Sequence, residues 1–336
     1  MAAFASARGL TLRPHAKTHK SGEIGRLQVA AGAAGLCCAK LGEAEALAAE
    51  GIAGLHLTSP VIAPGAIARL VALNGRCAGL SVVADHPDNV RALDAANAGG
   101  RALAVFVDVD PGIHRTGVAS PEAAVALAAE IEASANLQLA GLQFYCGSQQ
   151  HIQSFAERRA AIVDRTAYLR TVLDALKAAG HDVPVVTGGG TGTYLIDAEL
   201  GVLTELQVGS YIFLDREYGE CELAIGDAPV FEPALFIDAT VISANAAGMV
   251  TVDAGLKALS TDAGPPVVIG GGRYQFMGDE HGAIISEGGP LPGLGKRVTL
   301  QPGHCDPTVN LHDAYHVLEG DQVVEIWPVT ARGLST

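Results

Sequence analysis

Short apolar segments alternate with longer alanine-rich segments up to about residue 214. The short segments have the length of strands and are rich in β-branched residues; they are residues 10–15, 36–39, 54–58, 80–84, 103–109, 139–145, 183–186 and 205–208. The segments between them have helical character and cover residues 23–33, 42–50, 63–73, 87–98, 120–133 and 152–179, with a shorter connection around 194–200. This alternation is typical of parallel β/α units, and eight units favour a closed (β/α)₈ barrel of the TIM type over an open sheet.

The pattern changes after about Leu214, where long alanine-rich helices give way to short alternating segments. Strands are predicted at residues 234–242, 249–254, 267–269, 297–301, 314–318 and 323–329, separated by turns rich in glycine and proline. The sequence therefore predicts two domains: an α/β barrel over residues 1–222 and an all-β domain over residues 223–336.

Composition narrows the classes of protein that this chain can belong to. Of its 336 residues 49% are hydrophobic and 17% charged, which is a globular composition, and the net charge of −14 argues against nucleic-acid or anionic-membrane partners. No segment approaches the roughly 18 apolar residues of a membrane span, and the first residues lack the features of a signal peptide. Six cysteines without a CxxC pair favour reduced thiols and a cytoplasmic location.

A basic cluster at the end of the first predicted strand stands out in this acidic chain. Residues 13–20 contain an arginine, two histidines and two lysines, so we expect these cations to face a small anion. Lys17 follows the strand, and a lysine desolvated there has a lowered pKa that frees its amine for a Schiff base. The alternative is an ordinary solvated loop.

Glycine-rich loops follow the seventh and eighth predicted strands, where barrels of this kind commonly hold phosphate. Glycine lets backbone N–H groups approach an anion closely, and threonine or serine adds a hydroxyl donor. The candidate phosphate-binding residues are Gly189, Gly190, Thr191, Gly209, Ser210 and Tyr211. Such loops can also be simple tight turns.

A lysine and a phosphate site at one barrel mouth suit pyridoxal phosphate.

The segment Arg13-Pro-His-Ala-Lys-Thr-His-Lys20 resembles the cofactor-lysine motif of the fold-type III pyridoxal-phosphate enzymes, in the branch of D-threonine aldolase and D-serine dehydratase. The resemblance implies an alanine-racemase-like barrel followed by a β domain, a homodimer, and Lys17 as the residue that binds the cofactor aldehyde. It also implies that Arg115 and Tyr145 lie near the cofactor ring, with the arginine holding a phenolate, and that His151 is a catalytic base. The branch usually has a further segment before the first strand. Nine residues precede Leu10 here, so the segment is absent or the start lies upstream.

His304 and Asp306 form an H-x-D pair in the predicted β domain. If the backbone is extended there, both side chains point the same way and can bind a divalent ion, with Mn²⁺ expected first and Mg²⁺, Co²⁺ or Zn²⁺ as alternatives. The spacing alone is a weak signal, and Cys305 between them is expected to be a small buried residue. The resemblance strengthens the assignment of a metal site, because aldolases of the branch carry histidine and aspartate at these positions. The dehydratases of the branch carry histidine and cysteine there.

The expected function is that of a carbon–carbon lyase, which cleaves D-threonine and other D-3-hydroxy-α-amino acids to glycine and an aldehyde. Two alternatives remain open. One is a D-serine or 3-hydroxyaspartate dehydratase that uses the same site, and the other is a non-catalytic carrier of pyridoxal phosphate.

Overall fold

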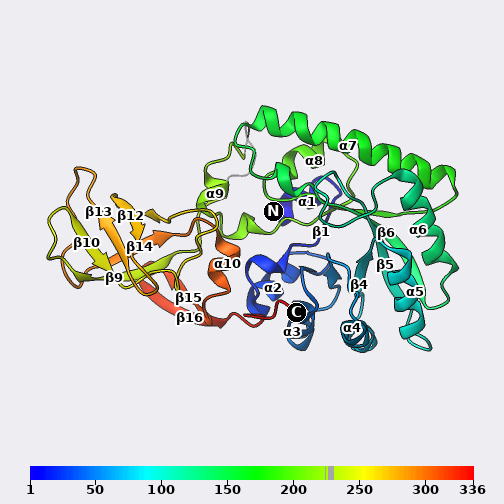
Figure 1. Cartoon of the computed structure of the whole chain (residues 1–336), viewed down its shortest axis with the longest axis horizontal. Helices are drawn as coiled ribbons and strands as arrows, with labels where there is room; N and C mark the ends of the chain where they lie inside the picture. Colours follow the sequence, from blue (N-terminus) through cyan, green and yellow to red (C-terminus); the bar gives the residue numbers. More distant parts are fainter. Residues whose placement is uncertain (224, 226–230) are drawn as a thin grey trace.

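The computed structural model describes residues 1–223, 225 and 231–336 of the chain. Two units lie side by side, an α/β barrel and a smaller β unit, and the short helices α9 (Arg216–Gly219) and α10 (Cys305–Val309) lie where they meet (Figure 1). The predicted boundary at 222/223 falls beside residues 224 and 226–230, which are outside the described residues, and it stays a prediction.

Eight parallel strands form the barrel in the order β1-β8-β7-β6-β5-β4-β3-β2. They are β1 (Thr11–Leu12), β2 (Cys37–Cys38), β3 (His56–Leu57), β4 (Ser81–Ala84), β5 (Leu103–Asp108), β6 (Leu137–Phe144), β7 (Val185–Gly188) and β8 (Glu205–Leu206). A parallel bridge between His15 and Cys37 connects the two ends of this order. The predicted (β/α)₈ barrel is confirmed, although several strands are shorter than expected.

Helices cover the outside of the barrel, and their apolar faces pack on the strands. They are α2 (Gly22–Ala30), α3 (Leu41–Ala49), α4 (Pro64–Arg76), α5 (Pro87–Ala96), α6 (Pro121–Ala133), α7 (Phe155–Ala178) and α8 (Tyr194–Leu200). Three of them begin at a proline, which suits the first helical position because its missing N–H would have no helical partner there. The short helix α1 (Ala2–Ser6) was not predicted; its Phe4 packs edge-on against Tyr194 with ring centroids 4.9 Å apart.

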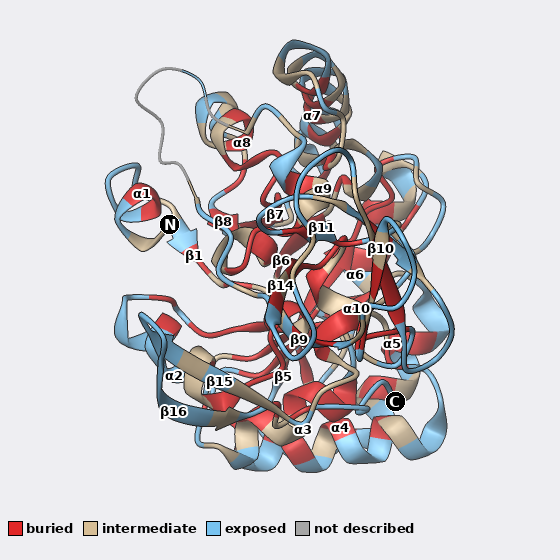
Figure 2. Cartoon of the chain, turned by 90° about the vertical axis from the view of Figure 1, so that its left-hand side faces the viewer, coloured by how far each residue is buried: buried red, intermediate tan, exposed pale blue. Residues whose placement is uncertain are grey.

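Six antiparallel strands close a second barrel in the order β10-β13-β12-β11-β14-β9. They are β9 (Ile237–Ser243), β10 (Met249–Val252), β11 (Val267–Val268), β12 (Arg273–Phe276), β13 (Gly282–Ile285) and β14 (Arg297–Gln301). The sequence did not predict β12 and β13, each of which is four residues long and lies between glycine-containing turns. A separate hairpin, β15 (Ala314–Glu319) with β16 (Gln322–Pro328), follows, and its residues are mostly half-buried or exposed (Figure 2).

The C-terminal tail returns from the hairpin to the first barrel. The Ala331 N–H donates to the Lys20 carbonyl at 2.9 Å, and the Gly42 N–H donates to the Thr336 carbonyl at 2.8 Å. Figure 1 shows the two chain ends on the barrel side of the molecule. The tail therefore attaches the end of the chain to the loop that follows Lys17.

Two further features bear on the sequence predictions. In the described part of the chain no helix combines the length and the apolar character needed to cross a bilayer. All six cysteines are free, and five of them are buried.

Candidate active site

Lys17 lies at the mouth of the first barrel, in the 3-10 segment η1 (Ala16–Thr18) that follows β1. The His15 ring caps this turn by accepting the Lys17 N–H at 3.3 Å. The Lys17 ammonium forms an ion pair with the Asp306 carboxylate, 289 residues away in sequence. Burial lowers the pKa of Lys17, but Asp306 and Tyr145 raise it by more, so the net pKa lies above the usual value. The expectation that desolvation frees this amine is wrong for the structure as it stands, since Asp306 holds it as an ammonium.

Two other cations of the basic cluster pair with carboxylates of the protein itself, so the expectation that the whole cluster faces one small anion is wrong. The Arg13 Nε lies 3.0 Å from both Glu205 oxygens, and the Lys20 Nζ lies 2.6 Å from Glu43 Oε1. Burial lowers the pKa of His15 well below its usual value and that of His19 to about 4, so both rings are neutral at pH 7. The cluster therefore builds buried contacts around Lys17.

Tyr145, after β6, lies near enough to Lys17 to interact with it electrostatically, and Arg115, after β5, lies against the Tyr145 ring. The Arg115 Cζ lies 5.6 Å from the centroid of the Tyr145 ring, within the range of a cation–π contact. Burial raises the pKa of Tyr145, and the lowering effects of Lys17 and Arg115 do not compensate for it. The expected phenolate is therefore wrong for this structure, which favours a neutral phenol.

His304 and Asp306 lie at the start of α10, so the expectation of an extended segment is wrong. His304 is the extended N-cap residue, and Asp306 lies in the first helical turn. Their side chains nevertheless approach each other, with His304 Nε2 4.0 Å from Asp306 Oδ1. Cys305 is fully buried in an apolar cluster with Phe213 and Val309, as the sequence predicted.

This pair combines two donor types that divalent ions accept, an imidazole nitrogen and a carboxylate oxygen. A separation of 4.0 Å is too long for a hydrogen bond, but an ion that binds at about 2.0–2.2 Å from each donor can reach both atoms. No group of three or more His, Cys, Asp or Glu side chains suited to a metal occurs among the described residues. His304 and Asp306 therefore fit a divalent ion that completes its coordination with water or substrate.

His151 follows the 3-10 segment η2 (Gly147–Gln149) and lies beside α9. Its ring centroid is 4.4 Å from that of Tyr218, and its Nδ1 is 3.7 Å from Glu217 Oε2 with no hydrogen-bond partner among the described residues. Burial lowers the pKa of His151, and the nearby Lys17 ammonium lowers it further, while Asp215 and Asp306 act in the opposite direction. His151 is therefore a neutral ring on the same side of the barrel as the lysine.

Asp215 connects α9 to α10, a role that sequence reasoning missed. Its Oδ1 accepts the Tyr218 N–H at 3.1 Å, and its Oδ2 accepts the Cys305 N–H at 3.0 Å. The position of Asp215 before a short helix is a recognisable N-cap signal. Its second partner lies 90 residues further along the chain, which no local pattern reveals. This carboxylate therefore fixes the start of the helix that carries Asp306.

The glycine loop after β7 is packed tightly around Gln150. A Cβ at Gly190 would lie 2.4 Å from Gln150 Oε1, and one at Gly192 would lie 2.0 Å from the Gln150 carbonyl oxygen. The Gly192 N–H already donates to Gln150 Oε1 at 3.0 Å, so packing explains part of the glycine content. The Thr191 hydroxyl is buried and has no hydrogen-bond partner within the part of the chain that the structure describes. That free hydroxyl fits an anion such as a phosphate oxygen.

The loop after β8 meets the Lys17 turn. A Cβ at Gly209 would lie 2.9 Å from Thr18 Oγ1, so glycine permits this close approach. Ser210 is buried and begins the 3-10 segment η3 (Ser210–Ile212). The Tyr211 hydroxyl accepts a hydrogen bond from Gln28 on α2 at 3.1 Å.

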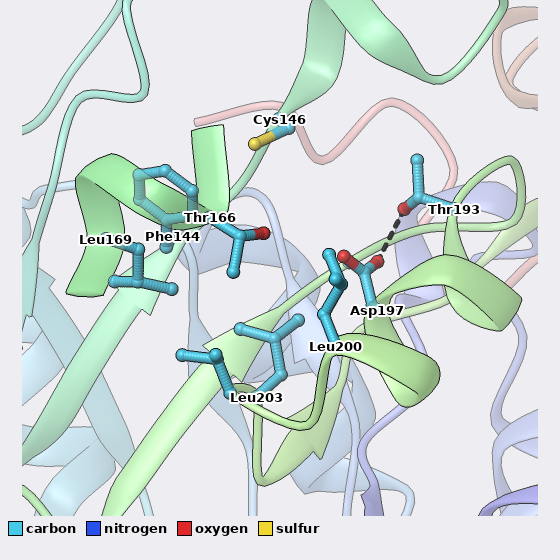
Figure 3. Close-up of a pocket in the computed structure, with 10 residues that line it drawn as sticks. Phe144, Cys146, Thr166, Leu169, Thr193, Asp197, Leu200 and Leu203 are labelled. Carbon is cyan, nitrogen blue, oxygen red and sulfur yellow. Dashed lines mark hydrogen bonds between the residues drawn. The ribbon is translucent and has the colours of Figure 1, made fainter. Parts of the chain in front are cut away.

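A small cavity lies next to the glycine loop (Figure 3). Phe144, Cys146 and Gly189 are among its lining residues, and its volume of about 10 Å³ has room for about one water molecule. Asp197 also lines it and accepts a hydrogen bond from Thr193 Oγ1 at 2.6 Å. Burial raises the pKa of Asp197 to about 7. The cavity is too small for an amino acid, so it supports the loop and does not bind substrate.

Comparisons with known proteins agree with this architecture. Residues 4–217 match the model of the alanine racemase N-terminal domain, and residues 234–318 match a putative serine dehydratase domain. The chain is 40% identical over 340 residues to a 3-hydroxy-D-aspartate aldolase of Paracoccus denitrificans, covering 99% of this chain and 88% of that protein. It is also 40% identical over 340 residues to a D-threonine aldolase of an Arthrobacter species, covering 100% and 89%.

A solved structure and a more distant relative complete the comparison. The crystal structure of D-threonine aldolase from Filomicrobium marinum is 38% identical with a TM-score of 0.97, covering 100% of this chain and 92% of that chain. A D-threo-3-hydroxyaspartate dehydratase of a Delftia species is 30% identical over 356 residues, covering 96% and 90%. The aldolases are thus more similar to this chain than that dehydratase. The chain belongs to the fold-type III pyridoxal-phosphate enzymes, in the family of D-threonine aldolase and 3-hydroxy-D-aspartate aldolase.

Proposed function

We propose that this protein is a pyridoxal-phosphate- and divalent-metal-dependent aldolase that cleaves D-threonine and other D-3-hydroxy-α-amino acids to glycine and an aldehyde. The observation that carries the proposal is the contact between Lys17 and Asp306. It joins the proposed cofactor lysine, on the first barrel, to the proposed metal ligand, on α10. A small amino acid can therefore meet both groups at once.

The cofactor would be held at the barrel mouth by residues of several loops. Lys17 would bind its aldehyde, Tyr145 and Arg115 would lie by its ring, and the buried Thr191 hydroxyl would donate to its phosphate. Gly189, Gly190, Gly209, Ser210 and Tyr211 complete the proposed phosphate loops. Bound pyridoxal phosphate supplies an electron sink for cleavage of the Cα–Cβ bond.

The metal ligands His304 and Asp306, together with His151, would act on the β-hydroxyl group of the substrate. His304 and Asp306 would hold a divalent ion, with Mn²⁺ proposed first, and such an ion supplies a Lewis acid that lowers the pKa of an alcohol. Burial keeps the pKa of His151 below its usual value, so its ring is neutral and can accept the hydroxyl proton. Glu217, 3.7 Å from His151, stabilises the imidazolium that this transfer creates.

We further propose that the protein is a cytoplasmic homodimer with domains at 1–222 and 223–336. The six free cysteines fit a reducing compartment. The hairpin β15–β16 carries exposed apolar side chains, Leu318, Val323, Val324 and Ile326, of the kind that subunit interfaces cover. The proposed domain boundary lies in the interval between the two matched segments.

Identification of the products tests the proposed reaction. Purified protein with pyridoxal phosphate and Mn²⁺ is incubated with D-threonine, with L-threonine as the control for stereochemistry. We expect glycine and acetaldehyde from the D-isomer alone, and none from a Lys17→Ala variant. Formation of 2-oxobutanoate and ammonia would establish the dehydratase instead. Binding of the cofactor without conversion of either isomer would establish a carrier.

A further inference from the structure

The side chain of Asp262 contacts the proposed metal ligand His304. It does so at the ring nitrogen that does not face Asp306. Asp262 Oδ2 is 2.6 Å from His304 Nδ1, which is a short hydrogen bond between side chains 42 residues apart in sequence. The loop between β10 and β11 supplies Asp262, while His304 is the N-cap residue of α10 and Asp306 lies in its first turn. The nitrogen on the other side of the ring, Nε2, is the one that faces Asp306 Oδ1.

This hydrogen bond fixes which ring nitrogen has a free lone pair. An ionised carboxylate can only accept, so the His304 proton must lie on Nδ1 when Asp262 binds it. The neutral ring then has its lone pair on Nε2, and the negative charge of Asp262 makes that nitrogen a stronger donor to a cation. Without the bond, the proton can move to Nε2, and the ring loses a contact that limits its rotation.

The loop that carries Asp262 is itself attached to the elements around the site. Arg216 of α9 donates to the carbonyl of Ala263, the residue after Asp262. The Ser260 hydroxyl donates to the His304 carbonyl at 3.3 Å, and a Cβ at Gly303 would lie only 2.9 Å from the Gly264 carbonyl oxygen. Contacts made by residues on both sides of Asp262 therefore hold this loop in place.

We propose that Asp262 is a positioning residue for the metal site, which orients His304 and raises its affinity for a divalent ion without binding the ion itself. This inference rests on the proposed function, because it assumes that His304 and Asp306 bind metal. An exposed ion pair with no role in binding is the competing explanation. The side chain of Asp262 is 53% exposed, so we expect an effect at the lower end of the 10- to 100-fold typical of such partners.

The test measures Mn²⁺ binding directly on the full chain loaded with pyridoxal phosphate and stripped of metal. Isothermal titration with Mn²⁺ alone gives the dissociation constant for wild type, Asp262→Ala and Asp262→Asn. We expect about tenfold weaker binding for Asp262→Ala, and a smaller loss for Asp262→Asn, whose amide oxygen still accepts a hydrogen bond. Thermal unfolding of the metal-free proteins is recorded in parallel, and we expect the midpoints to agree closely.

Asp238→Ala is the matched control. Asp238 is an aspartate of the β unit with a similar exposure, and it accepts a hydrogen bond from Thr299 instead of a histidine. Its Mn²⁺ affinity should equal that of wild type. Equal Mn²⁺ affinities for wild type and Asp262→Ala would overturn this inference and leave the proposed metal site standing. An equal loss of Mn²⁺ affinity in Asp238→Ala would overturn it in the same way. Failure of the wild-type protein to bind Mn²⁺ overturns the proposed metal site as well.

Discussion

The buried ion pair between Arg13 and Glu205 should stabilise the barrel beneath the Lys17 turn. The two side chains are 16% and 3% exposed, and Thr187 Oγ1 also donates to Glu205 at 2.8 Å. A Glu205→Gln substitution keeps the size of the side chain and removes its charge, which leaves the Arg13 guanidinium without a counter-ion. Removing one partner of a buried pair costs roughly 3–5 kcal/mol. We expect Glu205→Gln to lower the free energy of unfolding by about 3 kcal/mol, because Arg13 keeps its hydrogen bond to the Gly54 carbonyl.

This free energy converts into a measurable shift of the melting temperature. An unfolding entropy of roughly 2.1 cal/mol/K per residue gives about 0.7 kcal/mol/K for 336 residues, so the midpoint should fall by about 4 °C. Scanning calorimetry on wild type, Glu205→Gln, Arg13→Met and the double variant measures it. The double variant should lose less stability than the two single losses combined, since no lone charge remains. A Glu205→Gln midpoint within about 1 °C of wild type would show that the ion pair adds little stability. Additive losses of stability in the double variant would show that the two side chains do not stabilise each other.

Three further predictions concern the lysine, a buried carboxyl group and the glycine loop. Lys17→Ala should abolish the visible absorbance of bound pyridoxal phosphate, and a retained band would mean that another amine binds it. Burial raises the pKa of Asp197 to about 7, so the stability from its bound proton is complete below about pH 4 and is lost as the pH rises through 7. Asp197→Asn should therefore gain stability over wild type more at pH 8 than at pH 5 in denaturant titrations, and equal differences at both would contradict this. Gly192→Ala places a Cβ 2.0 Å from the Gln150 carbonyl oxygen, so it should weaken cofactor binding in titrations of the apoprotein. Gly75→Ala, with open space around its Cβ, is the control, and equal affinities would show that the loop adapts.

The barrel could be predicted because each of its units carries its own signal. Apolar strands, alanine-rich helices and first-turn prolines such as Pro64 and Pro87 are local features, and the eight recurring strands define the topology. Strands β12 and β13 lacked such a signal, since short strands between glycine turns have too few residues to show an alternation.

The site was harder to predict because its electrostatics depend on residues far apart in sequence. The basic cluster predicted a group of cations that faces a small anion. In the structure Glu205 of β8 pairs with Arg13, and Glu43 of α3 pairs with Lys20. The pKa of Lys17 likewise depends on Asp306, which reaches it from the other unit. The first turn of α10 did carry a local signal, since Asp306 and Pro307 suit a helix start. An interpretation based on strand periodicity overlooked it.

The proposed reaction needs the Lys17 amine and a divalent ion at one site, as the contact between Lys17 and Asp306 would allow. The most direct measurement is the rate of glycine formation from D-threonine before and after a chelator removes divalent ions, with pyridoxal phosphate held constant. We expect glycine formation to stop with the cofactor still bound, and added Mn²⁺ to restore it together with acetaldehyde. An undiminished rate in the chelator would show that cleavage needs no divalent ion.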